Sequence, residues 1–190
     1  MTRKKWVKHD GVWIQIGSPI WRLWHAWDVA RSKAAAKRNA RKAAKLAAKR
    51  GHIVKEALSL VGIREVPMGS NSGAAVKLIQ SATGAYGAPW CVSTVQRIWK
   101  VVLGSTWADK TAGAYYLEDY AKQHKATIAH PVAGCAVVYH IGDGHAGTVV
   151  AVNRNGTFWA VEGNWGNEVV HILRNPRLTP CTFILRPELR

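Results

Sequence analysis

The stretch that decides the fold is residues 136–161, AVVYHIGDGHAGTVVAVNRNGTFWAV. Short runs of β-branched, aromatic and small apolar residues alternate in it with Gly, Asp and Asn, which is typical of strands joined by turns. The Asn155-Gly156 pair between two of these runs favours a tight hairpin turn. Two similar runs follow, so the sequence predicts an antiparallel sheet. The predicted strands are 136–139, 148–152, 157–161, 169–173 and 182–185.

Helical patterns fill the chain before this sheet. Apolar residues recur at spacings of three and four in several segments, and glycine or proline separates these segments. Helices first and an antiparallel sheet afterwards indicate an α+β domain, with the N-terminal helices packed on the sheet. We place this domain at residues 52–190. The predicted helices are 53–61, 74–81, 91–103 and 112–124.

Positive charge is concentrated ahead of this domain. The chain of 190 residues has a net charge of +16 and is 48% hydrophobic, which suits one globular domain with an appendage. Residues 1–50 hold 14 Lys and Arg against 2 acidic residues, whereas residues 51–190 hold 13 against 9. Such an excess points to an anionic partner, such as nucleic acid, lipid or another anionic polymer. A solvated, self-repelling helix is the simpler explanation.

Residues 1–31 form a Trp-rich segment. Alternation over 12–16 predicts a short strand, and a helix is expected over 20–30. A segment this small has little core, so its tryptophans need a partner surface, another subunit or the main domain. We interpret the segment as an anchor. It contains five of the ten tryptophans, namely Trp6, Trp13, Trp21, Trp24 and Trp27.

Residues 32–51 predict a basic helical linker. Ala, Lys and Arg dominate the segment, and all three are strong helix formers. Ser32 is a suitable N-cap and Gly51 a suitable end. Leu46 is the only large apolar side chain between them, so the linker offers no apolar stripe for a coiled coil or a membrane-surface helix.

We expect no signal peptide, no membrane span and synthesis in a reducing cytoplasm. Asp10, Pro19 and Asp28 interrupt the apolar residues that follow the basic N-terminus, and no run approaches about 20 apolar residues. The three cysteines are too few and too scattered for a disulfide framework, and they lack the spacing of a zinc site. We expect Cys135 and Cys181 to be core residues.

Cys91 has the properties of a nucleophile. It follows Pro89 and Trp90 and opens an apolar helix. Amide groups at the start of a helix favour a thiolate and can hold an oxyanion when the thiolate attacks a carbonyl. The commoner fate of a cysteine is burial in the core, so further residues must support this interpretation.

A histidine and an acidic residue lie where they can serve Cys91. His145 stands between glycines at the start of a predicted strand, and His140 is its nearest competitor. Glu162 ends the next strand, and pairing through the hairpin returns the chain toward His145. A carboxylate there fixes the tautomer and orientation of the imidazole. Asn164 is placed to do the same work or to bind substrate.

These residues resemble the CHAP domain, a papain-like cysteine amidohydrolase and peptidase domain of phage lysins and bacterial cell-wall hydrolases. The resemblance covers about residues 52–186, which is nearly all of the non-basic part of the chain. One departure is Cys135, where such domains usually carry an aspartate that is outside the catalytic set. The matching motifs are 65–71 (EVPMGSN), 87–91 (GAPWC), 131–134 (PVAG), 145–147 (HAG) and 161–164 (VEGN).

The resemblance implies a papain-like fold and a set of site residues. Cys91 would be the nucleophile and His145 the general base and acid. Glu162 would orient His145, and Asn164 would support the site. We expect no metal and no cofactor. The candidate substrate-binding residues are Asn71, Trp90 and Trp165.

Three functions follow from these patterns. The first is a peptidoglycan hydrolase that cuts an amide bond, either as an endopeptidase or as an N-acetylmuramoyl-L-alanine amidase, in a free phage lysin or a tail-associated one. It would be made in the host cytoplasm and act at the cell wall, with the basic arm near anionic wall polymers. The second is a structural phage tail protein docked through its Trp-rich arm. The third, nucleic-acid binding by the basic helix, is weaker because no base-reading motif accompanies the charge.

Overall fold

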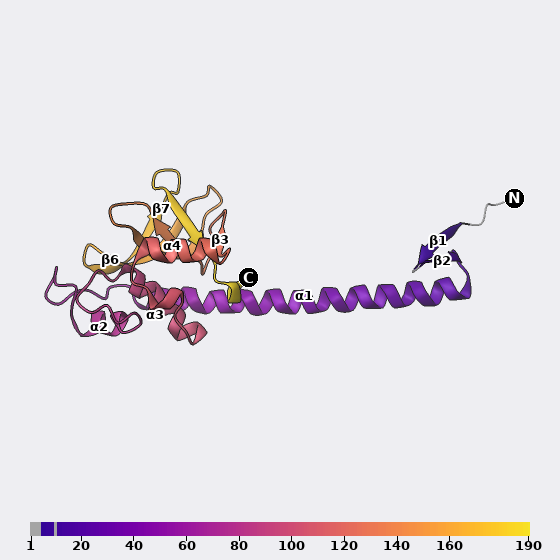
Figure 1. The fold of residues 1–190 in the computed structure, drawn as a ribbon, viewed down its shortest axis with the longest axis horizontal. Helices are drawn as coiled ribbons and strands as arrows, with labels where there is room; N and C mark the ends of the chain where they lie inside the picture. Colours follow the sequence, from indigo (N-terminus) through magenta and orange to yellow (C-terminus); the bar gives the residue numbers. More distant parts are fainter. Residues whose placement is uncertain (1–4, 10) are drawn as a thin grey trace. The chain divides into compact units, whose positions relative to one another are not determined.

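The computed structural model describes residues 5–9 and 11–190 (Figure 1). The chain divides into two compact units, Met1–Lys45 and Leu46–Arg190, which we call unit 1 and unit 2 and describe separately. Helix α1, Pro19–Ser59, contributes residues to both units.

Unit 1 consists of a β-hairpin and the first part of α1. Strands β1, Trp6–His9, and β2, Val12–Gln15, pair antiparallel. Ser18 caps the helix, because its hydroxyl accepts a hydrogen bond of 3.1 Å from the Trp21 amide. The predicted strand at 12–16 is confirmed as β2. Strand β1 is absent from the prediction because residues 5–9, KWVKH, show no clear apolar alternation.

Helix α1 overturns the predicted limits of the basic linker. Ser32 does not begin a helix and Gly51 does not end one, because a single helix runs through both. A glycine inside a helix costs only about 1 kcal/mol relative to alanine. The turns that follow Gly51 are stabilised by burial, since Ile53 and Ala57 are fully buried.

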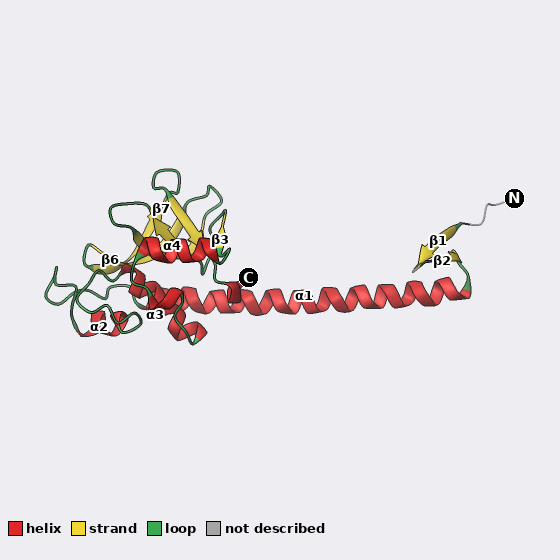
Figure 2. Ribbon diagram, viewed as in Figure 1, coloured by secondary structure: helices red, strands yellow, loops and turns green. Residues whose placement is uncertain are grey.

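Unit 2 contains a six-stranded sheet in the order β3-β8-β4-β5-β6-β7, with neighbouring strands antiparallel throughout. Figure 2 colours its strands yellow. All five predicted strands are confirmed, and three of them, β5, β6 and β7, are longer than predicted. The sixth, β3, has only two residues and is too short to show a pattern. The strands are β3 Thr127–Ile128, β4 Ala136–Tyr139, β5 His145–Val152, β6 Phe158–Trp165, β7 Glu168–Arg174 and β8 Cys181–Ile184.

Two helices of unit 2 pack on this sheet, and a third, α2, packs on α3, which confirms the α+β class. Helix α3 packs on β5 and β6, and helix α4 packs on β4 and β8. Gly104 ends α3 in the left-handed conformation that favours glycine. Besides α1, the helices are α2 Ala74–Gln80, α3 Cys91–Leu103, α4 Ala114–Gln123 and the short 3₁₀ turns η1 Ala108–Lys110 and η2 Pro187–Leu189.

The contact between α3 and β6 is tight at a glycine. A Cβ atom on Gly163 would overlap the Thr94 side chain and lie 3.0 Å from the Trp90 ring. Only a residue without a side chain lets the first turn of α3 come this close to β6. The start of α3, where Cys91 lies, is therefore held against the strand that carries Glu162.

Candidate active site

Cys91 is the first residue of α3. Its neighbour Trp90 precedes the helix in a non-helical conformation, and the Trp90 carbonyl accepts the Thr94 amide and hydroxyl, each at 3.0 Å. Cys91 itself is 7% exposed, so its thiol lies just below the surface. The first amide groups of a helix have no partner within it, and they face this end.

Trp90, the residue before the nucleophile, fixes the backbone at the start of α3. Its side chain is fully buried, and its indole N–H donates a hydrogen bond of 2.9 Å to Glu65 Oε1. The prediction that Trp90 contacts substrate is wrong, because a fully buried ring has no surface to offer. The bulky ring instead anchors the turn that leads into α3.

His145 and Glu162 meet across β5 and β6. His145 Nε2 lies 3.0 Å from Glu162 Oε2, which confirms the predicted pairing of these two side chains. The Glu162 carboxylate is fully buried. Gly147 makes room for it, because a Cβ atom there would lie only 2.7 Å from Glu162 Cγ. The small residue in the HAG motif is therefore a steric requirement of the Glu162 side chain.

The Cys91 thiol is the second partner of His145. Burial lowers the pKa of His145, but hydrogen bonds with Cys91 and Glu162 outweigh burial and raise this pKa to about 9. Glu162 occupies Nε2, so Nδ1 is the ring nitrogen left for the sulfur. The three side chains thus form a chain of contacts in which the imidazole of His145 lies between the Cys91 thiol and the Glu162 carboxylate.

Arg174 at the end of β7 completes the site and is missing from the sequence prediction. Its guanidinium binds the Glu162 carboxylate with both arms, Nε to Oε1 at 2.9 Å and Nη2 to Oε2 at 2.6 Å. Burial raises the pKa of Glu162, but the hydrogen bonds from Arg174 and His145 outweigh burial and lower it. Glu162 therefore stays ionised although it is buried.

Aromatic rings enclose this ion pair. The Arg174 guanidinium lies 4.1 Å from the Trp165 ring centroid and 5.2 Å from that of Tyr139. The same two rings flank His145, at centroid distances of 5.1 Å and 5.8 Å. Trp165 is partly exposed. Its contact with substrate stays a prediction. Tyr139 is buried, and burial raises the pKa of its hydroxyl.

Asn164 lies next to the site but does not hold His145. It has a positive φ of 59° in an irregular stretch where the pairing of β6 with β7 shifts register. Such a bulge changes where the following side chains point. In the described part of the chain, no hydrogen bond joins the Asn164 side chain to His145, and Glu162 occupies that position instead.

Asn71 lies on a loop that is tied to the segment before Cys91. The Asn71 amide donates to Glu65 Oε2 at 2.9 Å, while the other oxygen of that carboxylate binds Trp90. Gln80 donates to the carbonyls of both Asn71 and Ala88, at 3.1 Å and 2.9 Å. Glu65 and Gln80 are absent from the sequence prediction, although Glu65 begins the EVPMGSN motif. Hydrogen bonds of Glu65 and Gln80 therefore connect the Asn71 loop to the segment that precedes Cys91.

The competing residues are placed elsewhere. His140 binds Glu118 of α4, with Nε2 3.0 Å from Oε2. Cys135 is fully buried, and burial raises the pKa of its thiol to about 12. Cys181 is partly buried, and burial raises its pKa to about 11. These two thiols remain protonated near neutral pH, which leaves Cys91 as the candidate nucleophile.

Comparison with protein-family models, curated proteins and solved structures finds no match for this chain. Within the described residues, no group of three or more His, Cys, Asp or Glu side chains could hold a metal ion. None of the helices described is both long and apolar enough to cross a bilayer. The functional argument therefore rests on the geometry around Cys91.

Proposed function

We propose that unit 2 is a cysteine hydrolase of the papain-like CHAP type that cleaves amide bonds of peptidoglycan. The observation that carries this proposal is that Cys91, at the start of helix α3, is a partner of His145, whose ring is in turn bound by Glu162. A nucleophile, a base in contact with it and a third group that orients the base are the parts of a covalent acyl-transfer site. The substrate class comes from the motif resemblance in the sequence.

The first half of the reaction forms an acyl-enzyme. With its raised pKa, His145 is an imidazolium at neutral pH. The thiolate is the form of Cys91 that reacts as a nucleophile. The sulfur attacks the amide carbonyl carbon, and the oxyanion that forms accepts hydrogen bonds from amide groups at the start of α3. The C–N bond breaks as His145 gives its Nδ1 proton to the leaving amine. A thioester on Cys91 and neutral His145 remain.

The second half releases the acyl group. Neutral His145 takes a proton from water, and the resulting hydroxide attacks the thioester carbon. The C–S bond breaks, which gives a carboxylic acid and restores the thiolate and imidazolium pair. Glu162 keeps the ring oriented in both halves, because it binds Nε2 and leaves Nδ1 facing the sulfur.

The test is loss of turbidity of purified peptidoglycan, with the products identified by mass spectrometry. Cys91→Ala should slow clearing at least about a thousand-fold without unfolding the protein. Cys181→Ala is the matched control, because it removes a thiol outside the site and should retain activity. New amine and carboxyl termini would identify the bond. Equal clearing by wild type and Cys91→Ala would end the proposal.

A further inference from the structure

Unit 1 exposes large apolar side chains to an unusual degree. Trp13 is 62% exposed, Leu23 73% and Trp27 55%, whereas Ile14 is the single buried apolar side chain among those described in the hairpin. The described part of unit 1 has little else to bury them against. Contiguous exposed apolar surface on a small unit marks an interaction site.

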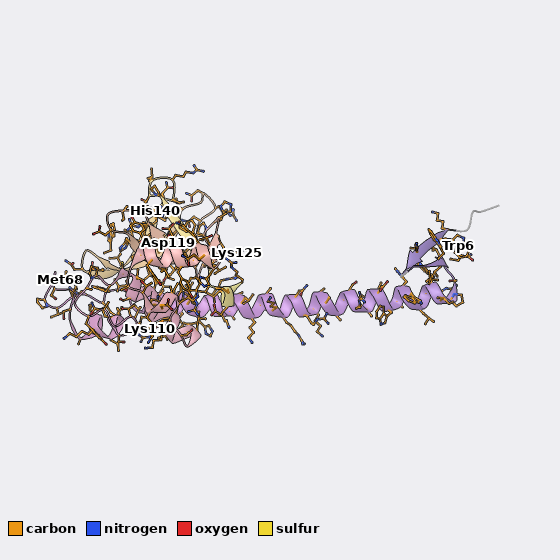
Figure 3. All side chains as sticks on the ribbon, viewed as in Figure 1. Trp6, Met68, Lys110, Asp119, Lys125 and His140 are labelled. Carbon is orange, nitrogen blue, oxygen red and sulfur yellow. The ribbon has the colours of Figure 1, made fainter. Side chains whose placement is uncertain are left out.

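These side chains lie on two surfaces. Val7 and Ile14 are paired across the hairpin, and together with Trp21 and Trp24 of α1 they line one small cavity, so this side of the hairpin faces the helix. Because side chains alternate along a strand, Trp6 and Trp13 point to the opposite side, with Lys8 directly across from Trp13. Trp6 is labelled in Figure 3.

The second surface is a stripe on α1. Ile20, Leu23 and Trp27 follow one another at spacings of three and four, so they share a face of the helix, and all three are exposed. The same face continues with exposed cations, and the first of them, Arg31, lies 4.8 Å from the centroid of the Trp27 ring. The cations in line with the stripe are Arg31, Arg38, Arg41 and Lys45.

The net charge of unit 1 indicates which kind of partner can cover these surfaces. Residues 1–45 carry 12 Lys and Arg against Asp10 and Asp28, a net charge of +10. A second copy of the chain would bring two such charges together, which opposes self-association. A soluble polyanion would neutralise the cations but would leave the tryptophans in water. A bilayer with anionic headgroups satisfies both, because indole rings settle at the interface and Lys and Arg bind the headgroups.

We propose that unit 1 binds the surface of a bilayer containing anionic lipid, with Leu23 and Trp27 in the interface and the cations of α1 on the headgroups. The association in this proposal is interfacial, with the apolar stripe of α1 at the headgroup boundary. It needs neither Cys91 nor the proposed hydrolase activity. The proposal therefore goes beyond the function of unit 2 and fails or stands separately from it.

The test is flotation of the full chain with vesicles, either of phosphatidylglycerol mixed with phosphatidylcholine or of phosphatidylcholine alone. Binding to the anionic vesicles and loss of binding on the neutral ones are expected. Leu23→Ser should weaken binding about three-fold, and Leu23→Ser with Trp27→Ser about ten-fold or more. Leu178→Ser is the matched control, because Leu178 is 80% exposed on a turn of unit 2.

Charge variants separate the cations of α1 from the general charge of the protein. Arg38→Gln and Arg41→Gln should each weaken binding about five-fold. Arg154→Gln and Arg177→Gln, at exposed positions of unit 2, should leave binding unchanged. Circular dichroism at equal concentration shows that each variant keeps its helix content.

Three results would overturn the proposal. The first is no binding to phosphatidylglycerol vesicles even at low salt. The second is binding that heparin abolishes and that Leu23→Ser with Trp27→Ser leaves unchanged, because bare charge would then explain it. The third is oligomerisation of the wild type in sedimentation that the same double variant removes, because a second copy would then cover the stripe.

Discussion

Glu162 is fully buried and still ionised, because Arg174 and His145 both donate hydrogen bonds to it. Arg174 balances its charge directly. The remaining two groups, Cys91 and His145, must then carry opposite charges or none if the buried network is to stay neutral. A thiolate beside an imidazolium meets this condition, and an isolated thiolate does not.

This balance predicts how Glu162 and Arg174 depend on each other. Glu162→Gln leaves the partly buried Arg174 guanidinium without its anionic partner and should lower the free energy of unfolding by about 3 kcal/mol, with a loss of activity of at least about a hundredfold. Adding Arg174→Gln removes the unpaired charge, so stability should recover while activity stays low. Urea unfolding and kcat/KM measure the two effects. Joint recovery of both would show that Glu162 has only a structural role.

The raised pKa of His145 predicts an alkaline limit to activity. The imidazolium that protonates the leaving amine is present below the folded pKa and is lost as the pH rises through about 9. We expect kcat/KM to fall about ten-fold per pH unit above that value. NMR titration of His145 should give the same pKa, and Cys91→Ala should lower it. A titration near 6.5 in the wild type would contradict this reasoning.

At the residue scale, the sequence predicts the groups that do chemistry better than the groups that support them. Cys91, His145 and Glu162 lie in short motifs beside glycines, and a hairpin turn brings two of them together. Arg174 lies opposite Phe158 across β6 and β7 and reaches Glu162 only through its long side chain. That contact depends on strand twist and register, which residue patterns do not show.

At the scale of elements, helix α3 and the strands were predictable because their apolar patterns are strong and glycine or proline bounds them. The extent of helix α1 is harder to predict, because Ser32 and Gly51 are local signals for a helix start and a helix end, whereas the burial of Ile53 and Ala57 depends on packing. The small cost of a glycine inside a helix is outweighed by the burial of the apolar side chains that follow it.

The contact between α3 and β6 gives a prediction at this scale. Gly163→Ala places a Cβ atom into the Thr94 side chain and against Trp90, so the start of α3 must move away from Glu162. We expect a loss of about 2 kcal/mol in stability and a marked fall in kcat. Gly51→Ala is the matched control, because nothing lies within 4 Å of a Cβ atom there and alanine favours the helix by about 1 kcal/mol.

For the whole molecule, the division into two units predicts which truncation is tolerated. Residues 46–190 retain Arg50, whose Nη1 donates to the Leu189 carbonyl at 3.0 Å and whose Cβ fits against Gly134. This fragment should unfold within a few degrees of the full chain. A fragment starting at residue 54 loses Arg50 and buried Ile53, and its Tm should drop by about 10 °C. Equal Tm values for both fragments would contradict this assignment.

The measurement that tests the central claim most directly is the rate at which iodoacetamide alkylates each cysteine at neutral pH, followed by mass spectrometry. It needs no knowledge of the substrate. Cys91 should react at least about ten-fold faster than Cys135 and Cys181, and His145→Gln should remove this advantage, because the imidazolium stabilises the thiolate. If Cys91 reacts no faster than Cys181, or is unaffected by His145→Gln, the thiol and imidazole do not form a working pair.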